Sequence, residues 1–367
     1  MTTFCHHDHF CVVFKQNQLQ MNRKILFLPD AGYVNPFQQQ LMRFLQGNGL
    51  KVCSAPSRRF FATWRAVRQH RPDIICFDWI QSFIIGRNLP VTLLKCLTFT
   101  LEILYLTKIR RIPVLHTLHN LRNHAKRQVG IERWMYRFFL RHCTRIRVYS
   151  PTTITKARRL FGIPTDHFRV IQDVPFHYFY PNNSGFAKSR QHLGMDEYAF
   201  VYLFLGMVKP YKGLEDLIAA FGQLNDPKAR LVIAGISESA EYARQIQRLA
   251  DGDPRITYHN RFVAIENVQH YLNAAQVVVL PFRNVEHSGS MDLALSFGKP
   301  IISLETRFFA ELLSHQQPLL FNHSDGALLD ALQNAQRMDL DAIARRNFQI
   351  ADSVNHRDLL PFFTDGF

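Results

Sequence analysis

The chain has 367 residues, of which 47% are hydrophobic and 20% are charged, a length that suits two compact domains better than one. Its net charge of +15 is uneven: residues 1–195 hold 29 Lys and Arg against 8 Asp and Glu, whereas residues 196–367 hold 15 against 21. We find no charge-free stretch of about 18 residues, no secretory signal and no paired cysteines, which argues against a membrane-spanning, secreted or disulfide-stabilised protein.

Strand-like and helix-like blocks alternate through the first half of the chain from Met21 onward. Residues 1–20 precede this pattern and are predicted to be a disordered extension. The blocks follow in this order: strand 24–29, helix 35–47, strand 50–55, helix 63–72, and strands 73–79, 112–118 and 146–150. Alternation of this kind predicts a parallel sheet with helices on both faces.

The apolar segment 80–109 fits this alternation less well. It carries few charges and is followed by Arg110 and Arg111. One interpretation is a long buried helix, and the other is a helix that lies in a membrane interface, with Lys95 and Lys108 against lipid headgroups. The positive first half favours the second interpretation, because it implies an anionic partner: nucleic acid, a phosphorylated substrate or the anionic inner face of a membrane.

The second half repeats the alternation. Strands are predicted at 200–206, 229–235, 255–260, 276–282 and 299–304, with helices at 213–224, 238–250, 266–274 and 288–297. Pro, Asn, Ser and Gly break the rhythm between about residues 175 and 197, which indicates a junction. We therefore expect an α/β protein with two Rossmann-like, doubly wound domains, at 21–180 and 190–345, and a helical tail at 346–367. Two such sheets facing each other would form a deep cleft at the carboxyl ends of their strands.

The junction after strand 200–206 has the composition of a phosphate site. The strand ends at Gly206, the next helix begins at Gly213, and Lys209 and Lys212 lie between them. The amides and the positive end of a helix favour an anion, and two lysines make the position suitable for a diphosphate. Lysines in turns are usually only solvated, but this location predicts that they bind phosphate.

A second polar loop follows strand 276–282. It carries Arg283 and Glu286, and the sequence Ser288-Gly289-Ser290 then opens a helix whose first amides would face an anion. Glu286 could accept hydrogen bonds from sugar or ribose hydroxyls. A capping role for Ser288 would explain that serine but not the composition of the whole loop.

Four blocks of the second half resemble the donor half of bacterial GT-B glycosyltransferases: GMVKPYKGLEDLIAAF, LVIAG, NAAQVVVLPFR and SGSMDLALSFGKPII. The likeness is to group 1 and family 4-like enzymes, similar to the xanthan-type β-mannosyltransferases that build exopolysaccharides. In the first half, FDWI, HTLHNLRNH, IERWMYRFFLR and VYSPTT resemble the acceptor half. The resemblance covers about residues 23–350. Each block is weak alone, and their order makes them specific.

The resemblance implies a GT-B fold in which the C-terminal domain holds a nucleotide-sugar donor and the N-terminal domain faces the acceptor and the membrane. It implies no metal and no cofactor, since the GDP- or UDP-linked sugar is a substrate. Lys212 matches the family's diphosphate lysine and Glu286 the first glutamate of a paired-glutamate motif. The sequence departs from the family at Ala294, where the second glutamate would fall, and at Met207, where an arginine is common. The donor-binding residues are thus predicted to be Gly206, Lys209, Lys212, Arg283, Glu286, Ser288, Gly289 and Ser290.

The cluster LHTLHNLRNH (115–124) begins at the carboxyl end of a predicted strand, in the expected cleft. Sugar transfer needs a group that takes the proton of the attacking hydroxyl, and the pKa of histidine suits this role near neutrality. The candidate catalytic residues are His119, His124 and Asp78, with Asp30 as a rival base. The histidines would otherwise hold an acceptor phosphate or only shape the loop.

Residues of the same loops are predicted to bind the acceptor: Asp30, Asn35, Asn120 and Arg122. His116 lies one residue inside its strand and is predicted to pack in the core. The family pattern has His-Gly where this chain has Gln172-Asp173. Zinc is disfavoured because no convergent set of cysteines or carboxylates accompanies the histidines.

The leading hypothesis is a cytoplasmic glycosyltransferase, peripheral on the inner membrane. It would move a hexose, with mannose favoured, from a nucleotide diphosphate to a lipid-linked saccharide in exopolysaccharide or cell-surface glycan synthesis. One alternative is a catalytically inactive, nucleotide-binding scaffold, suggested by Ala294 and Met207. Another is a nucleic-acid-binding protein, which the charge allows but no helix-turn-helix, zinc or basic-aromatic pattern supports. The sequence leaves open the nucleotide base, retention or inversion at the sugar, and the oligomeric state.

Overall fold

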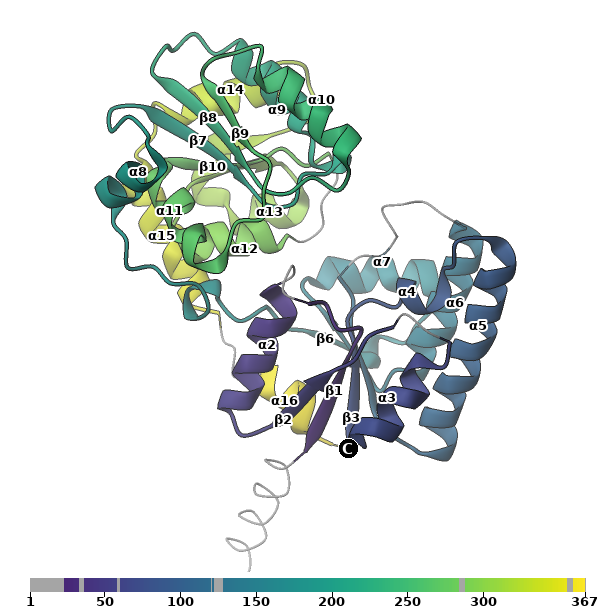
Figure 1. The fold of residues 1–367 in the computed structure, drawn as a ribbon. Helices are drawn as coiled ribbons and strands as arrows, with labels where there is room; N and C mark the ends of the chain where they lie inside the picture. Colours follow the sequence, from purple (N-terminus) through teal and green to yellow (C-terminus); the bar gives the residue numbers. More distant parts are fainter. Residues whose placement is uncertain are drawn as a thin grey trace, which may run out of the picture. The chain divides into compact units, whose positions relative to one another are not determined.

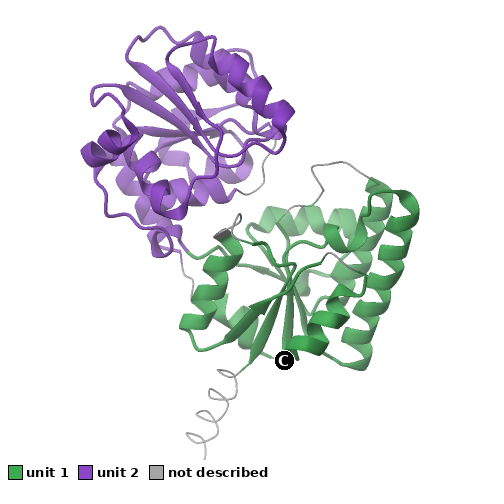
Figure 2. Cartoon of the chain, in the orientation of Figure 1, with its two compact units in different colours: residues 1–174, 355–367 green, residues 175–354 purple. Residues whose placement is uncertain are grey.

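The computed structural model describes residues 23–366 except 33–35, 58–59, 120, 122–127, 284–287 and 355–358. The chain divides into two compact units, one formed by residues 1–174 and 355–367 and the other by residues 175–354 (Figure 2). The chain leaves the first unit after Val174 and returns to it after Val354, within the predicted tail. The predicted extension, residues 1–20, lies outside the described residues.

A six-stranded parallel sheet, in the order β2-β1-β3-β4-β5-β6, forms the centre of the first unit (Figure 1). Its strands are β1 (Lys24–Leu28), β2 (Lys51–Ser54), β3 (Ile74–Phe77), β4 (Val114–Thr117), β5 (Arg145–Val148) and β6 (Phe168–Val170). Ile25 and Phe27 of β1 join one hydrophobic core, and Leu26 and Leu28 join the other. Because both faces of the sheet are covered at its centre, residues 25–28 of β1 and all of β3 are apolar at successive rather than alternate positions.

Helices cover both faces of this sheet. One core takes apolar side chains from α3 (Ala62–His70), α4 (Gln81–Ile84), α5 (Leu89–Leu104), α6 (Val129–His142) and α7 (Pro151–Phe161). The other core takes side chains from α2 (Pro36–Gly47) and from α16 (Leu359–Thr364), near the far end of the chain. Phe362 and Phe363 of α16 are buried there, and Arg23 Nη1 donates to the carbonyl of Thr364 at 2.7 Å. The last helix therefore completes the core of the first unit.

The apolar segment 80–109 forms α4, α5 and a π-helical turn, Tyr105–Ile109. Phe99 and Ile103 of α5 are buried in the core, whereas the opposite face of the helix is exposed. The interpretation as a long buried helix is therefore wrong for that face. By length and composition, Leu89–Ile109 would suffice to cross a membrane, and 39% of its most apolar window is buried inside the protein.

The second unit is built on another six-stranded parallel sheet, in the order β12-β11-β10-β7-β8-β9 (Figure 1). Its strands are β7 (Phe200–Leu205), β8 (Ala229–Ala234), β9 (Ile256–His259), β10 (Val277–Leu280), β11 (Ile301–Leu304) and β12 (Leu320–Phe321). Its helices are α8 (Phe186–Leu193), α9 (Leu214–Gly222), α10 (Ala240–Ala250), α11 (Ile265–Ala274), α12 (Gly289–Ser296), α13 (Arg307–Leu312), α14 (Ala327–Ala335) and α15 (Leu340–Asp352). The prediction of two parallel α/β domains is confirmed.

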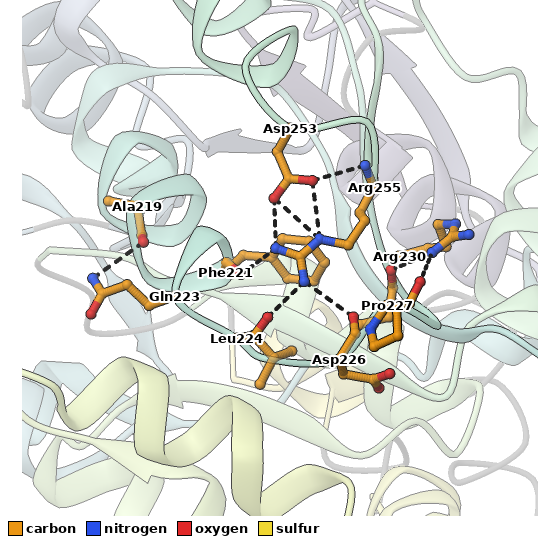
Figure 3. A network of polar contacts seen from close by, with 10 residues as sticks. Ala219, Phe221, Gln223, Leu224, Asp226, Pro227, Arg230, Asp253 and Arg255 are labelled. Carbon is orange, nitrogen blue, oxygen red and sulfur yellow. Dashed lines mark hydrogen bonds and ion pairs between the residues drawn. The ribbon is translucent and has the colours of Figure 1, made fainter.

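Arg255, just before β9, fastens the end of α9 to the sheet (Figure 3). Its Nη1 donates to the carbonyl oxygens of Leu224 at 2.6 Å and of Asp226 at 3.1 Å. Its Nη2 donates to the Asp253 carboxylate at 2.7 Å, and the guanidinium lies over the ring of Phe221 at 5.0 Å. A single side chain thus holds the loop that follows α9 against the residues just before β9.

Candidate functional site

In the second unit, the carboxyl ends of β7 and β8 meet at two glycines. Gly206 has φ 144° and Gly235 has φ 150°, and a Cβ on Gly235 would lie 1.9 Å from the carbonyl oxygen of Gly206. A Cβ on Gly206 would lie 3.2 Å from Ser290 Oγ and 3.3 Å from Lys212 Nζ. Glycine is therefore required at both positions, and it brings the backbone of Gly206 close to Ser290 and Lys212.

Lys212 is a buried lysine in the short turn between β7 and α9. The residue is 8% exposed, and its ammonium lies 5.0 Å from the ring centre of Phe282 and 5.5 Å from that of Phe204. In the part of the chain that the structure describes, no carboxylate or carbonyl accepts a hydrogen bond from Nζ. Burial, and then the charge of Lys209, lower the pKa of Lys212 to about 8. A buried cation without a counter-charge is costly, and a bound anion would remove that cost.

The turn that carries Lys212 is held against the loop after β10. Gly213 has φ 69°, and a Cβ on it would lie 2.1 Å from the carbonyl oxygen of Pro281. The amide of Arg283 donates to the carbonyl of Tyr211 at 3.1 Å. These contacts fix the position of Lys212 relative to the residues that directly follow β10.

Helix α12 begins with the predicted Ser288-Gly289-Ser290 sequence. Ser288 occupies the N-cap position, but its side chain makes no capping hydrogen bond. A capping role therefore does not account for this serine. Gly289 and Ser290 are the first residues of the helix, so their amides lack intrahelical acceptors and are available to an anion.

Arg283 forms an ion pair that the sequence analysis did not anticipate. Its Nε and Nη2 donate to the two carboxylate oxygens of Asp216 at 2.8 and 3.1 Å, and Nη2 lies 3.6 Å from Glu215 Oε2. The side chain is about half-exposed and lies at the first turn of α9. A nucleotide-sugar donor could bind the Arg283 guanidinium only by competing with the carboxylate of Asp216. Glu286, the other predicted residue of this loop, lies outside the described residues.

In the first unit, Asp78 directly follows β3, is buried, and forms hydrogen bonds through its side chain and its amide. Its Oδ2 accepts a hydrogen bond from Gln38 Nε2 at 2.7 Å, and its amide donates to the carbonyl of Leu28 at 2.9 Å. Gln38 of α2 also donates to the carbonyl of Pro29 and accepts from the amide of Ala31, both at 2.9 Å. One glutamine thus ties Asp78 to the loop after β1.

His119 lies beside this carboxylate. Its Nε2 is 3.9 Å from Asp78 Oδ1, and in the described structure neither of these buried atoms has a hydrogen-bond partner. Nδ1 lies 3.2 Å from the hydroxyl of Tyr149. The ring stacks on Trp79, with centres 4.8 Å apart, and meets the edge of Phe37 at 4.7 Å. The imidazole is therefore held in one orientation between a carboxylate and a phenol.

Arg147, on β5, packs against the ring of Tyr149. Its guanidinium is fully buried and lies 5.1 Å from the ring centre of Tyr149. Its Nε donates to the carbonyl of Ile171 at 3.1 Å, and its Nη2 pairs with the carboxylate of Asp173. Asp173 belongs to the Gln172-Asp173 departure from the family pattern, so this chain uses that position to neutralise a buried arginine.

Two further predicted residues behave differently. His116 is packed in the core, as predicted, with Nδ1 2.7 Å from the carbonyl oxygen of Phe77, and burial lowers the pKa of His116 to about 4. Asp30 is exposed, and its Oδ1 accepts a hydrogen bond from the amide of Gly32 at 3.0 Å. The remaining predicted residues of this site lie outside the described residues: Asn35, Asn120, Arg122 and His124.

The structure brings five of the predicted residues into two sites, one in each unit: Gly206, Lys212 and Ser290 in the second unit, and Asp78 beside His119 in the first. Sequence reasoning missed Gln38, Trp79 and Tyr149. Tyr149 directly follows β5 and Trp79 lies two residues after the end of β3, within the quoted VYSPTT and FDWI blocks, and that position was the available signal. Within the described residues, no group of three or more His, Cys, Asp or Glu could hold a metal ion.

Family comparisons divide the chain in the same way. Residues 29–173 match the model described as a glycosyl transferase 4-like domain, and residues 199–337 match the model described as glycosyl transferases group 1. The chain is 25% identical over 345 residues to the GDP-mannose:glycolipid 4-beta-D-mannosyltransferase of Xanthomonas campestris pv. campestris. That match covers 90% of this chain and 89% of the relative.

Solved structures are similar over nearly the whole chain. The sucrose-phosphate synthase of Thermosynechococcus elongatus matches with a TM-score of 0.72 and 17% identity, covering 92% of this chain and 96% of that protein. HepE of Anabaena, in complex with UDP and glucose, matches with a TM-score of 0.69 and 17% identity, covering 93% and 97%. At these identities, the likeness concerns the fold.

Proposed function

This chain is a GT-B glycosyltransferase, with a family 4-like domain in its first half and a group 1 domain in its second, and we propose that it transfers mannose from GDP-mannose to a lipid-linked saccharide. The name of the Xanthomonas relatives, which specifies GDP-mannose and a glycolipid, supports this choice of donor and acceptor. Their identity of 25% extends over nine-tenths of both chains, so both domains contribute to the likeness.

The observation that carries the donor half of the proposal is the buried ammonium of Lys212. It lies beside Gly206 together with Ser290, at the start of α12. A diphosphate here would supply a counter-charge that the described residues do not provide, and would accept hydrogen bonds from the first amides of α12. In the transfer step, Lys212 and these amides would stabilise the negative charge that develops on the leaving diphosphate. The proposal invokes no metal ion or other cofactor.

For the acceptor half, we assign the general base to His119. Asp78 faces its Nε2 and would stabilise the imidazolium, so that Nδ1, on the Tyr149 side, accepts the proton of the attacking hydroxyl. The relatives are named for a β-linkage, and mannose is α-linked in GDP-mannose. Making that linkage in one displacement inverts the anomeric carbon and needs a base of this kind.

The proposed place of action is the cytoplasmic side of the inner membrane, with the enzyme bound peripherally. The lipid-linked acceptor requires access to a membrane surface, and the basic first half of the chain suits an anionic one. The product would be an intermediate of exopolysaccharide or another cell-surface glycan. In this scheme the partners are the nucleotide sugar, the glycolipid and the membrane, and nucleic acid is not among them.

A thermal-shift panel tests the donor site first. The purified protein is heated with GDP-mannose, GDP, UDP-glucose, UDP or duplex DNA, because a ligand that binds only the folded state raises the melting temperature. We expect stabilisation by GDP-mannose and GDP, and loss of that stabilisation in Lys212→Met. Lys228→Ala, an exposed lysine of the same unit, is the matched control and should respond like the wild type. A shift with DNA but with no nucleotide would reject the proposal.

Transfer is then measured with radiolabelled GDP-mannose and lipid extracts. Labelled lipid, unaffected by EDTA, is the expected product. Nucleotide stabilisation without transfer to any glycolipid fraction would instead identify an inactive scaffold. Ala294 is the feature that favours this second candidate, because the position of the family's second glutamate is here a fully buried alanine.

A further inference from the structure

The outer face of α5 carries a ridge of exposed leucines. Leu89, Leu93, Leu97 and Leu101 are 51%, 54%, 57% and 51% exposed, and residues four apart lie on one side of a helix. Monomeric proteins rarely leave such a continuous apolar strip in water. Phe99 on the opposite side is 1% exposed and belongs to the core, so the ridge does not result from a poorly packed helix.

The neighbouring helix α6 also exposes an aromatic side chain. Thr100 of α5 contacts Met135 of α6, which places the two helices side by side (Figure 1). On α6, Trp134 is 61% exposed and stacks on Phe138, and Phe138 in turn packs on His142. Exposed tryptophan beside leucine is typical of surfaces that sit at a membrane interface.

The charges around the strip have one sign. Each helix contains a single acidic residue, Glu102 in α5 and Glu132 in α6, and both are buried. The exposed charged residues between 86 and 111 and between 129 and 142 are all cations: Arg87, Lys108, Arg110, Arg111, Arg133, Arg137 and Arg141. An apolar strip with positive margins complements an anionic lipid surface. A second copy of the same face would instead bring like charges together.

We propose that the outer face of α5 and α6 binds an anionic lipid bilayer, with α5 lying in the interface and not crossing it. A crossing would require Cys96, Phe99 and Ile103 to leave the core of the first unit. In the interface, the leucines and Trp134 enter the lipid, and Arg137 and Arg141 of α6 meet phosphate headgroups; Arg133 instead donates to the carbonyl of Leu160. The proposal rests on the proposed function only in its choice of a membrane as the partner.

Vesicle flotation tests this surface without donor or acceptor. The full chain is mixed with vesicles of phosphatidylcholine alone or with added phosphatidylglycerol. We expect it to float with the anionic vesicles and to be released by high salt to a large extent. The double variant Leu93→Glu and Leu97→Glu should lower partitioning by roughly tenfold or more, since it places charge in the apolar strip. Arg137→Glu with Arg141→Glu should weaken binding to the anionic vesicles in particular.

The matched control is Leu249→Glu, a leucine of α10 in the second unit that is 41% exposed. It should float like the wild type. Each variant is also checked for the GDP-mannose thermal shift, so that loss of docking is distinguished from a misfolded protein or a failed donor site. Equal flotation of the Leu93 and Leu97 double variant would overturn the proposal. So would a wild type that stays unbound, or one that forms dimers through this face.

Discussion

At the scale of single residues, Lys212 is the group whose environment most directly implies a ligand. Its burial beside Phe204 and Phe282 disfavours the charged form, and the structure offers it no carboxylate within the described residues. The folded protein therefore contains a buried ammonium in an unfavourable environment, and a bound diphosphate would stabilise it. Buried charged groups with shifted pKa values are concentrated at functional sites. We therefore place the donor diphosphate beside Lys212.

The pH dependence of donor binding follows from this lysine. With a pKa lowered to about 8, the ammonium is lost as pH rises through that value, so GDP-mannose affinity should fall above about pH 8, approaching tenfold per pH unit. The free protein should show the opposite trend. Between about pH 8 and the unfolded lysine value of about 10.4, the unfolded state binds the extra proton, so stability rises with pH. Titration calorimetry measures the affinity, and Lys212→Met should bind weakly at every pH.

The second residue-level prediction concerns the proton acceptor. His119→Ala and Asp78→Asn should each lower kcat by roughly 100-fold to 10,000-fold, the usual contribution of a positioned base. Both variants should keep the GDP-mannose thermal shift, because the two residues belong to the first unit. His70→Ala, in the same unit and outside this site, serves as the control. If both catalytic variants retained full transfer rates, the base would have to be sought elsewhere.

The composition of these sites could be predicted only in part. Lys212 and Ser290 belong to short motifs at strand–helix junctions, so the local sequence reveals them. The surroundings of His119 come from three separated segments, through Gln38, Asp78 and Tyr149. No local sequence pattern predicts that these three segments lie together, because their proximity depends on the order of the strands in the sheet.

At the scale of elements, Arg255 shows how one side chain holds a loop against a neighbouring strand. Arg255→Ala would leave the carbonyls of Leu224 and Asp226 without this donor, and Asp253 without its ion pair. We expect a loss of about 2 kcal/mol in the free energy of unfolding, measured by urea denaturation. Arg230→Ala is the matched control, since the hydrogen bonds of Arg230 to described residues go to carbonyls within three residues, and its loss should cost much less. Equal losses would show that the network of Figure 3 adds nothing specific.

Elements with a clear periodic pattern were predictable, and the shortest strands were not. The predicted strand 24–29 is β1 at Lys24–Leu28, and the predicted helix 288–297 is α12 at Gly289–Ser296. In contrast, β6 and β12, which have three and two residues, were not predicted. A strand that short shows no periodicity, and only its pairing with a neighbouring strand creates it. The exposure of the leucines on α5 was also hidden, because composition does not reveal which face of a helix is covered.

At the scale of the whole molecule, the two units differ in charge and in chemistry. The first unit combines cations with the apolar strip of α5, which suits a membrane-bound acceptor. The second unit contains Lys212 and the start of α12, which suit a soluble nucleotide. Composition alone indicated this division. It did not indicate that α16 returns to the first unit, since that contact joins residues more than 300 positions apart, such as Arg23 and Thr364.

That return can be tested by removing residues 355–367. Leu359, Phe362 and Phe363 are almost completely buried in the first unit, and burying side chains of this size contributes about 1.5–3 kcal/mol each. Their loss is comparable with the whole stability of a domain, which is about 5–15 kcal/mol. Hydrogen exchange should therefore show lost protection in β1 and α2. Protection of β7 to β11, and the GDP-mannose shift, should persist because those elements form the other unit.

Point variants separate this effect from truncation itself. Phe363→Ala, which removes a fully buried ring, should give the same pattern in weaker form, whereas Phe348→Ala, 41% exposed in α15, should leave β1 protected. Unchanged exchange in β1 after truncation would mean that α16 only covers the first unit without stabilising it. Simultaneous loss of protection in both sheets would mean that the two units unfold as one. Independent responses would instead support a division in which acceptor and donor machinery are stabilised separately, each by its own core.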